Sequence, residues 1–197
     1  YTLIITVVSV LIGFVLGIIL ALMRLGHNKL LHGLAVAYIE FIRGTPLMVQ
    51  VMFVYFGIGA VIQSLPALAA GIIAVSLNSS AYVAEVIRSG IESIAIGQTE
   101  AARSLGMSQK QTYQYVVIPQ AIKNIWPALG NEFITLIKES SIVSVIGVGD
   151  LMYQTQLVQS ATYKGVAPLA ITMVIYFVLT FTLSKGLNYF EGKMKHE

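Results

Sequence analysis

Two polar groups interrupt long apolar stretches of this sequence, and their residue types suit the binding of a small polar molecule. One group falls between residues 66 and 89, and the other between residues 127 and 147. The candidates for ligand contact are Asn78, Ser79, Tyr82, Glu85, Glu139 and Ser140. A charged side chain within lipid costs about 2.5–3.5 kcal/mol on insertion scales, so such residues mark function by default. If Glu139 faces a cavity, its charge favours a ligand with a cationic group.

Each candidate also has a structural alternative. Asn78 and the serines beside it could join helices by hydrogen bonds, as polar residues in membrane bundles often do. Glu85 could pair with Arg88, three residues further along the same helix. Tyr82 could be a packing residue, and Glu139 could belong to a structural ion pair.

The composition defines the surroundings of these residues. Of the 197 residues, 56% are hydrophobic and only 11% are charged, and the mean hydropathy is +0.80. Soluble domains carry about 25% charged residues, whereas apolar stretches of this length can cross a bilayer. We therefore predict an all-α integral membrane protein, because open sheets cannot satisfy their backbone in lipid. Cysteine is absent, which excludes thiolate metal sites, and a net charge of +3 is too weak for a nucleic-acid partner.

Five transmembrane helices are predicted within a single domain of residues 1–197. The spans cover about 2–23, 46–62, 66–89, 127–147 and 168–185. We expect Pro46, Pro66 and Pro127 each to open a span, because proline is tolerated in the first helical turn and disfavoured in the interior. An amphipathic stretch containing Glu40 and Arg43, expected to pair at i,i+3, predicts an interfacial helix before the second span.

The two polar groups are predicted to lie at one depth. The midpoint of the third span falls near Asn78, and that of the fourth near Lys138 and Glu139. The two spans are antiparallel, so these groups are level with each other. Lys138 and Glu139 are about 100° apart around a helix. We expect Glu139 to face the cavity and Lys138 to face a neighbouring helix or extend towards water.

Charge asymmetry predicts the orientation in the membrane. With residues 92–123 in the cytosol, ten of the twelve lysines and arginines fall on the cytoplasmic side and only Lys164 falls in an outer loop. The ten are Arg24, Lys29, Arg43, Arg88, Arg103, Lys110, Lys123, Lys185, Lys193 and Lys195. The positive-inside rule then predicts an N-terminus outside and a C-terminus in the cytoplasm.

The cytoplasmic segment of residues 92–123 is rich in polar and small residues. A short helix over residues 100–105 is expected to end at Gly106, a C′ glycine. Ser108 is expected to cap a second helix, which should end before Pro119. The small residues suit docking into a groove on another protein, whereas a bilayer-facing helix would carry large apolar residues. A solvated helix without a partner is the alternative.

This segment, GQTEAARSLGMSQKQTYQYVVIPQA, resembles the EAA loop of ABC-importer permeases, whose pattern is EAA, three residues, Gly, nine residues and I-x-L-P. The matching residues are Glu100, Ala101, Ala102 and Gly106, followed by VVIP at 116–119 with two conservative departures. The stretches FIRGTPLMVQ (41–50), NSSAYVAEVIRSGIESI (78–94) and LIKESSIVSVIG (136–147) are similar to the polar amino acid uptake subfamily, of His/Gln/Arg type. The resemblance covers nearly the whole chain.

The resemblance implies a type I ABC-importer permease that works by alternating access in a prokaryotic inner membrane. Glu100, Ala101, Ala102 and Gly106 would form a coupling helix seated on an ATPase subunit. The implied partners are two ATPases carrying ATP and Mg, a second permease chain, an identical copy or a close homologue, and an extracytoplasmic amino-acid-binding protein. The substrate would be a polar amino acid, with arginine, histidine or lysine favoured by Glu139. The permease would not itself be an enzyme, and the pattern G-x-x-x-x-G-K-[ST] of a P-loop occurs nowhere in the sequence.

Other classes of membrane protein account for fewer of these features. An ion-coupled secondary transporter should show inverted repeats, and no convincing repeat is visible. A channel would need rings of pore-lining residues, and a membrane anchor has no use for matched polar groups at one depth.

Overall fold

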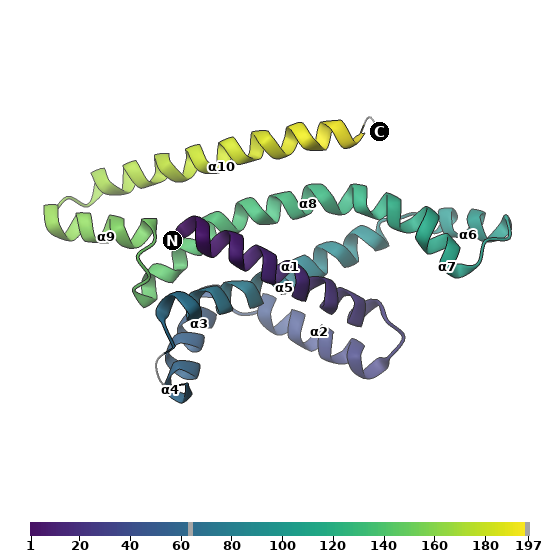
Figure 1. The fold of residues 1–197 in the computed structure, drawn as a ribbon, viewed down its shortest axis with the longest axis horizontal. Coiled ribbons are helices and arrows are strands. Elements are labelled where there is room, and N and C mark those ends of the chain that lie inside the picture. The colour runs from purple at the N-terminus through teal and green to yellow at the C-terminus, as the bar shows by residue number, and fades with distance from the viewer. Residues whose placement is uncertain (63–64, 196–197) are drawn as a thin grey trace.

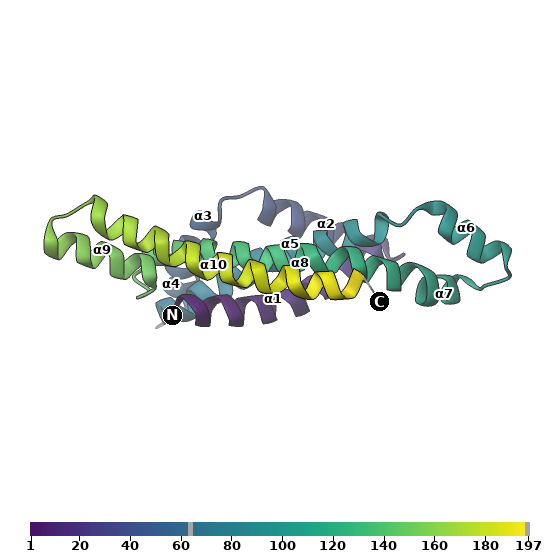
Figure 2. The ribbon, with the colours of Figure 1, turned by 90° about the horizontal axis from the view of Figure 1, so that it is seen from above.

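The computed structural model describes residues 1–62 and 65–195, and this part of the chain is helical without a β-strand. Four long helices run alongside one another, as both views show (Figures 1 and 2). They are α1 (Thr2–Leu25), α5 (Ala67–Glu92), α8 (Ile118–Glu139) and α10 (Val166–Lys195). The shorter helices are α2 (Lys29–Arg43), α3 (Leu47–Met52), α4 (Gly59–Val61), α6 (Ile96–Ser104), α7 (Gln109–Thr112) and α9 (Leu151–Thr162). π-helical segments cover Phe53–Ile58 and Tyr113–Val117, and a 3₁₀ segment covers Ser140–Ile146.

A row of small residues brings α1 and α5 into close contact. Ser9, Gly13, Gly17 and Ala21 recur every four residues on α1, and all four are buried. A Cβ at Gly17 would lie 2.6 Å from a side-chain carbon of Val83, so only glycine permits this approach. Helices in lipid associate through such small-residue faces, because apolar side chains gain little from leaving lipid for each other.

Three helices of the described chain are long and apolar enough to cross a membrane, namely α1, α5 and residues Val166–Tyr189 of α10. The pair formed by α2 and Leu47–Val61 passes the same test together but is bent by 104°. The bend separates α2 from the second predicted span, in which α3, a π-helical segment and α4 follow one another without a break. Gln50 Nε2 stabilises the bend by donating to the carbonyls of Ile42 (2.7 Å) and Thr45 (3.1 Å).

The prediction that Pro127 opens a helix is wrong, because Pro127 lies inside α8. A proline there removes one N–H of the helix ladder, but packing on both sides of it keeps α8 continuous. Ile125 lies directly against Gly90 of α5, and Gly130 packs against Leu187 of α10. Tertiary contacts of this kind allow proline within membrane helices.

The prediction that the second cytoplasmic helix ends before Pro119 is also wrong. The chain continues from α7 through the π-helical segment Tyr113–Val117 directly into α8. Pro119 then occupies the first turn of α8, where proline requires no hydrogen-bond donor. Residues 109–117 are thus joined to α8 by continuous helix rather than through a loop.

Candidate functional site

The segment predicted to be cytoplasmic forms a helical hairpin of α6 and α7. Figures 1 and 2 show it projecting beyond the long helices, at the end of the molecule opposite the N-terminus. Gly106 follows α6 with φ of 86°, and the N–H of Met107 donates to the carbonyl of Ala102 at 3.2 Å. Ser108 caps α7 in a capping box with Gln111. The predicted roles of Gly106 and Ser108 in ending and starting helices are confirmed, although α6 begins earlier than predicted, at Ile96.

The surface of this hairpin is open to a partner. Glu100 and Ala101 are exposed, while Ala102 is buried beneath them. Two apolar side chains at the ends of α6 point outwards, since Ile96 is 76% exposed and Leu105 is 85% exposed. Apolar residues at such exposure on a projecting element are typical of a surface that another protein covers.

The hairpin is connected to the bundle on two sides. Asn124 of α8 donates to Ser93 Oγ at 2.9 Å, just beyond the end of α5. Next to this hydrogen bond, Gly90 of α5 lies against Ile125 of α8. The base of the hairpin is therefore in contact with both α5 and α8.

Glu85 lies at the centre of a charged cluster rather than beside an empty cavity. Its carboxylate accepts hydrogen bonds from Arg24 at 2.8 Å and from Arg88 at 2.5 and 3.2 Å. Arg43 approaches the same carboxylate at 3.7 Å, and Arg88 also pairs with Glu92. The structural alternative for Glu85, an ion pair with Arg88, is confirmed, and two further arginines from α1 and α2 join it.

Arg43 does not form the predicted pair with Glu40. Its guanidinium lies over the ring of Tyr82, 5.6 Å from the ring centroid, as well as near Glu85. The packing of α2 on α5 turns Arg43 towards α5, which is why the local i,i+3 spacing does not decide its partner. Tyr82 is 36% exposed and thus remains accessible from outside the chain.

The other candidates on α5 are buried within the bundle. Asn78 is 4% exposed and donates to Gln50 Oε1 at 3.0 Å, so it joins α5 to α3. Ser79 is 1% exposed and faces Gly13 of α1. Both act as contacts between helices in this structure.

The second group of candidates lies at the end of α8. Glu139 and Lys138 are exposed, whereas Ser140 is fully buried and donates to the carbonyl of Ile137. Lys138 lines a groove of about 390 Å³ between α8, α9 and α10, together with Tyr176. This agrees with the expectation that Lys138 faces a neighbouring helix.

The structure brings the two groups of candidates together only in part. Gly71 packs on Val143 and Gly90 on Ile125, so α5 and α8 are antiparallel, and Asn78 and Glu139 both lie between these contacts. Within the described residues, no hydrogen bond or ion pair joins any two of the six predicted ligand residues. Within a single chain, Asn78, Ser79 and Ser140 are buried, whereas Tyr82 and Glu139 are open to the outside.

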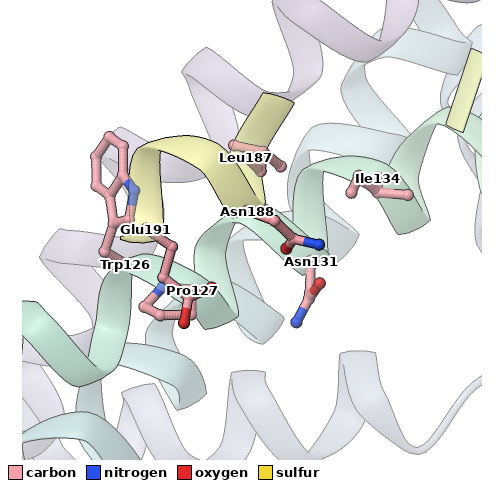
Figure 3. Close-up of a pocket in the computed structure, with 8 residues that line it drawn as sticks. Trp126, Pro127, Asn131, Ile134, Leu187, Asn188 and Glu191 are labelled. Atoms are coloured by element: carbon pink, nitrogen blue, oxygen red, sulfur yellow. The ribbon is translucent and has the colours of Figure 1, made fainter. Parts of the chain in front are cut away.

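Two features were not part of the site predicted from the sequence, one acidic residue of α8 and one cavity beside that helix. Glu132 lies two turns before Glu139 on the same face of α8 and is half-buried; its i,i+7 spacing was the available signal. A small cavity of about 50 Å³ between α8 and α10 is the other, and Figure 3 shows side chains of both helices around it. Trp126, Asn131 and Asn188 are among its lining residues. The two helices that line this cavity, α8 and α10, are far apart in sequence, so no local pattern indicated the cavity.

Known proteins are similar to this chain in sequence and in fold. A family model described as binding-protein-dependent transport system inner membrane component matches residues 13–196. The probable glutamine ABC transporter permease protein of Bacillus subtilis is 42% identical over 195 residues, covering 99% of this chain and 90% of that protein. The arginine transport system permease protein of the same organism is 44% identical over 195 residues, covering 98% and 89%. The nopaline transport system permease protein of Agrobacterium fabrum is 37% identical, covering 93% and 80%.

Solved structures agree with these relatives. The crystal structure of an amino acid ABC transporter with histidines contains a chain with 52% identity and a TM-score of 0.93, covering 98% of this chain and 90% of that one. The inward-facing MetNI methionine ABC transporter, at 21% identity, has a TM-score of 0.78, covering 98% and 92%. The second likeness concerns the fold alone.

The fold and the projecting hairpin define a helical membrane permease of the type I ABC-importer class. The chain belongs to the family of binding-protein-dependent transport system inner membrane components. It is a permease subunit, and the ATPase of such a transporter is a separate subunit. The comparisons give no support to an ion-coupled secondary transporter.

Proposed function

We propose that this chain is the permease subunit of an importer of polar amino acids. The support comes from relatives that cover nearly all of it, whose names specify glutamine, arginine and nopaline transport. All three compounds carry an α-amino acid group or a derivative of it, together with a polar side chain. Polar side chains on α5 and α8, within an otherwise apolar bundle, suit such substrates.

The working assembly contains two permease chains, two ATPase subunits that bind ATP and Mg, and an extracytoplasmic amino-acid-binding protein. The second permease is an identical copy or a close homologue. The N-terminus of this chain lies outside and the C-terminus in the cytoplasm, which places the α6–α7 hairpin in the cytosol beside the ATPases.

The hairpin is the observation that carries the mechanism. Closure of the ATPases on ATP displaces α6 and the turn after it, where Glu100, Ala101 and Gly106 form the docking surface and Ala102 packs beneath it. The continuous path from α7 into α8, and the Asn124–Ser93 hydrogen bond, pass this displacement to α8 and α5. The permease opens outwards to take the amino acid from the binding protein, and hydrolysis returns it to the inward-facing state.

Substrate recognition is assigned to the exposed end of α8. Glu139 is exposed on the single chain and is available to a cavity shared with a second permease. Its carboxylate would hold the α-amino group or a cationic side chain, which favours arginine, histidine or lysine over glutamate.

The test is uptake by the transporter reconstituted in liposomes with its ATPase and binding protein. Arginine, histidine, lysine, glutamine and glutamate are compared in the wild type, in Glu139→Gln and in the control Glu92→Gln. We expect Glu139→Gln to lose transport or change its preference among these amino acids, while the control stays close to the wild type. Unchanged arginine uptake in Glu139→Gln would exclude the assigned role of Glu139, and failure of the wild type to transport any of the five would overturn the proposed function.

A further inference from the structure

A depression on the surface of α2 and α5 is lined by side chains of both charges. Its volume is about 290 Å³, and its lining residues are Glu40, Arg43, Gly44 and Tyr82. On this measure about 10–15 Å³ is enough for one water molecule, so the depression has room for a small polar molecule such as an amino acid.

The arginine of this depression is available to a ligand. Glu85 is already bound by Arg24 and Arg88 at 2.8 and 2.5 Å, so it does not need the more distant Arg43, at 3.7 Å. The Arg43 side chain is 38% exposed, and the ring of Tyr82 supports its guanidinium group. A guanidinium held in this way can bind a carboxylate through two parallel hydrogen bonds.

The carboxylate of the depression is equally accessible. Glu40 is exposed, one helical turn before Arg43 on α2, and within the described residues it forms no ion pair. A cation and an anion that line one depression without neutralising each other are complementary to a zwitterion. Binding of a zwitterion also adds no net charge to the cluster around Glu85.

We propose that Glu40 and Arg43 form a second amino acid site, which a substrate occupies on its way to the cytoplasm. Glu40 accepts hydrogen bonds from the α-ammonium group, and Arg43 donates to the α-carboxylate. The site rests on the proposed function and extends it. Tyr82 lies one helical turn beyond Asn78 towards the end of α5 that leads to α6, which is the exit side if the hairpin faces the cytosol.

The side chain of the substrate is not gripped at this site, since the charged pair addresses only the groups that all amino acids share. We therefore expect the site to accept glutamine and arginine alike. Selectivity remains with the residues at the end of α8.

Cysteine labelling tests the site directly, because the chain contains no cysteine of its own. Ala37→Cys, at an exposed position one helical turn before Glu40 on α2, is introduced so that all four lining residues are kept. The transporter with its ATPase is placed in nanodiscs, and the rate of modification of the permease band by a methanethiosulfonate reagent is measured. Saturating glutamine or arginine should slow this rate in the Ala37→Cys chain and also when Glu139→Gln is added. Adding Arg43→Gln or Glu40→Gln should raise the half-protecting concentration about tenfold or more, since each removes a charge-assisted hydrogen bond. Lys29→Gln, at the other end of α2, is the matched control and should leave protection intact.

The outcomes separate this site from the proposed function. If the same preparation transports amino acids but Ala37→Cys shows no protection, the second site does not exist, while the proposed function stands. If Glu139→Gln alone abolishes the protection, the protection comes from ligand bound at Glu139, and the proposal is overturned. A phosphatidylethanolamine headgroup is also a zwitterion, so labelling is repeated without amino acid in phosphatidylethanolamine and phosphatidylcholine nanodiscs. Slow labelling confined to phosphatidylethanolamine would assign the depression to lipid and overturn the substrate site.

Discussion

At the scale of single residues, Glu85 connects three helices through one carboxylate. Arg24 reaches it from α1, Arg43 from α2 and Arg88 from α5 itself. These side chains are between 16% and 38% exposed, which is intermediate between surface and buried ion pairs. Removing the shared carboxylate leaves several arginines without a partner, and this is more costly than losing one exposed pair.

Glu85→Gln should therefore destabilise the permease by about 1–4 kcal/mol, between the values for exposed and buried pairs. Glu92→Gln is the control, since Glu92 pairs with Arg88 alone and is more exposed. Its effect should stay below about 1 kcal/mol. Thermal unfolding of the detergent-solubilised transporter measures both, and equal melting temperatures for the two variants would contradict the central position of Glu85.

Sequence rules predicted residues whose conformation is decided locally. Gly106 ends α6 and Ser108 caps α7 because both roles depend on neighbours within four residues. The partners of Glu85 were predicted only in part. Arg88 is three residues away, whereas Arg24 and Arg43 come from helices whose packing on α5 is not encoded in the local spacing. For the same reason Asn78 was a candidate ligand residue in the sequence and proves to bond Gln50 of α3.

At the scale of elements, proline was a poor guide to where α8 begins. Pro127 lies inside that helix because α5 and α10 pack on either side of it, and no local rule contains those contacts. The apolar stretches that predicted α1 and α5 were reliable, since length and hydropathy alone define them. The break between α2 and α3 falls at Pro46, where the second span was expected to begin, but the hydrogen bonds of Gln50 across this bend were not predicted.

The contact between α1 and α5 depends on glycine at two positions. Gly17→Leu should displace α1 from α5, because even a Cβ would approach Val83 to 2.6 Å and overpacking costs typically about 1–3 kcal/mol. Gly33→Leu on α2 is the matched control, as nothing lies within 4 Å of a Cβ there. Size-exclusion profiles and melting temperatures in mild detergent compare the two. A Gly17→Leu chain as stable as Gly33→Leu would show that close approach does not hold these helices together.

At the scale of the whole molecule, the chain separates a bundle of long apolar helices from the projecting α6–α7 hairpin (Figure 1). The long helices provide the scaffold and the polar groups along it. The hairpin exposes Ile96 and Leu105 at the two ends of α6. Its base is in contact with both α5 and α8. This division of labour matches a permease whose energy is supplied by another subunit.

Co-purification of the ATPase with the permease tests the account most directly. The native complex is extracted in mild detergent from cells that express the wild type, Gly106→Arg or Gly186→Arg. Arginine at Gly106 strains a backbone at φ of 86° and obstructs the docking surface, whereas a Cβ at Gly186 meets nothing within 4 Å and lies on α10. We predict an ATPase subunit with the wild type and Gly186→Arg, and its loss with Gly106→Arg. An ATPase that remains equally bound in all three, or that is absent from the wild type, would contradict docking through this hairpin.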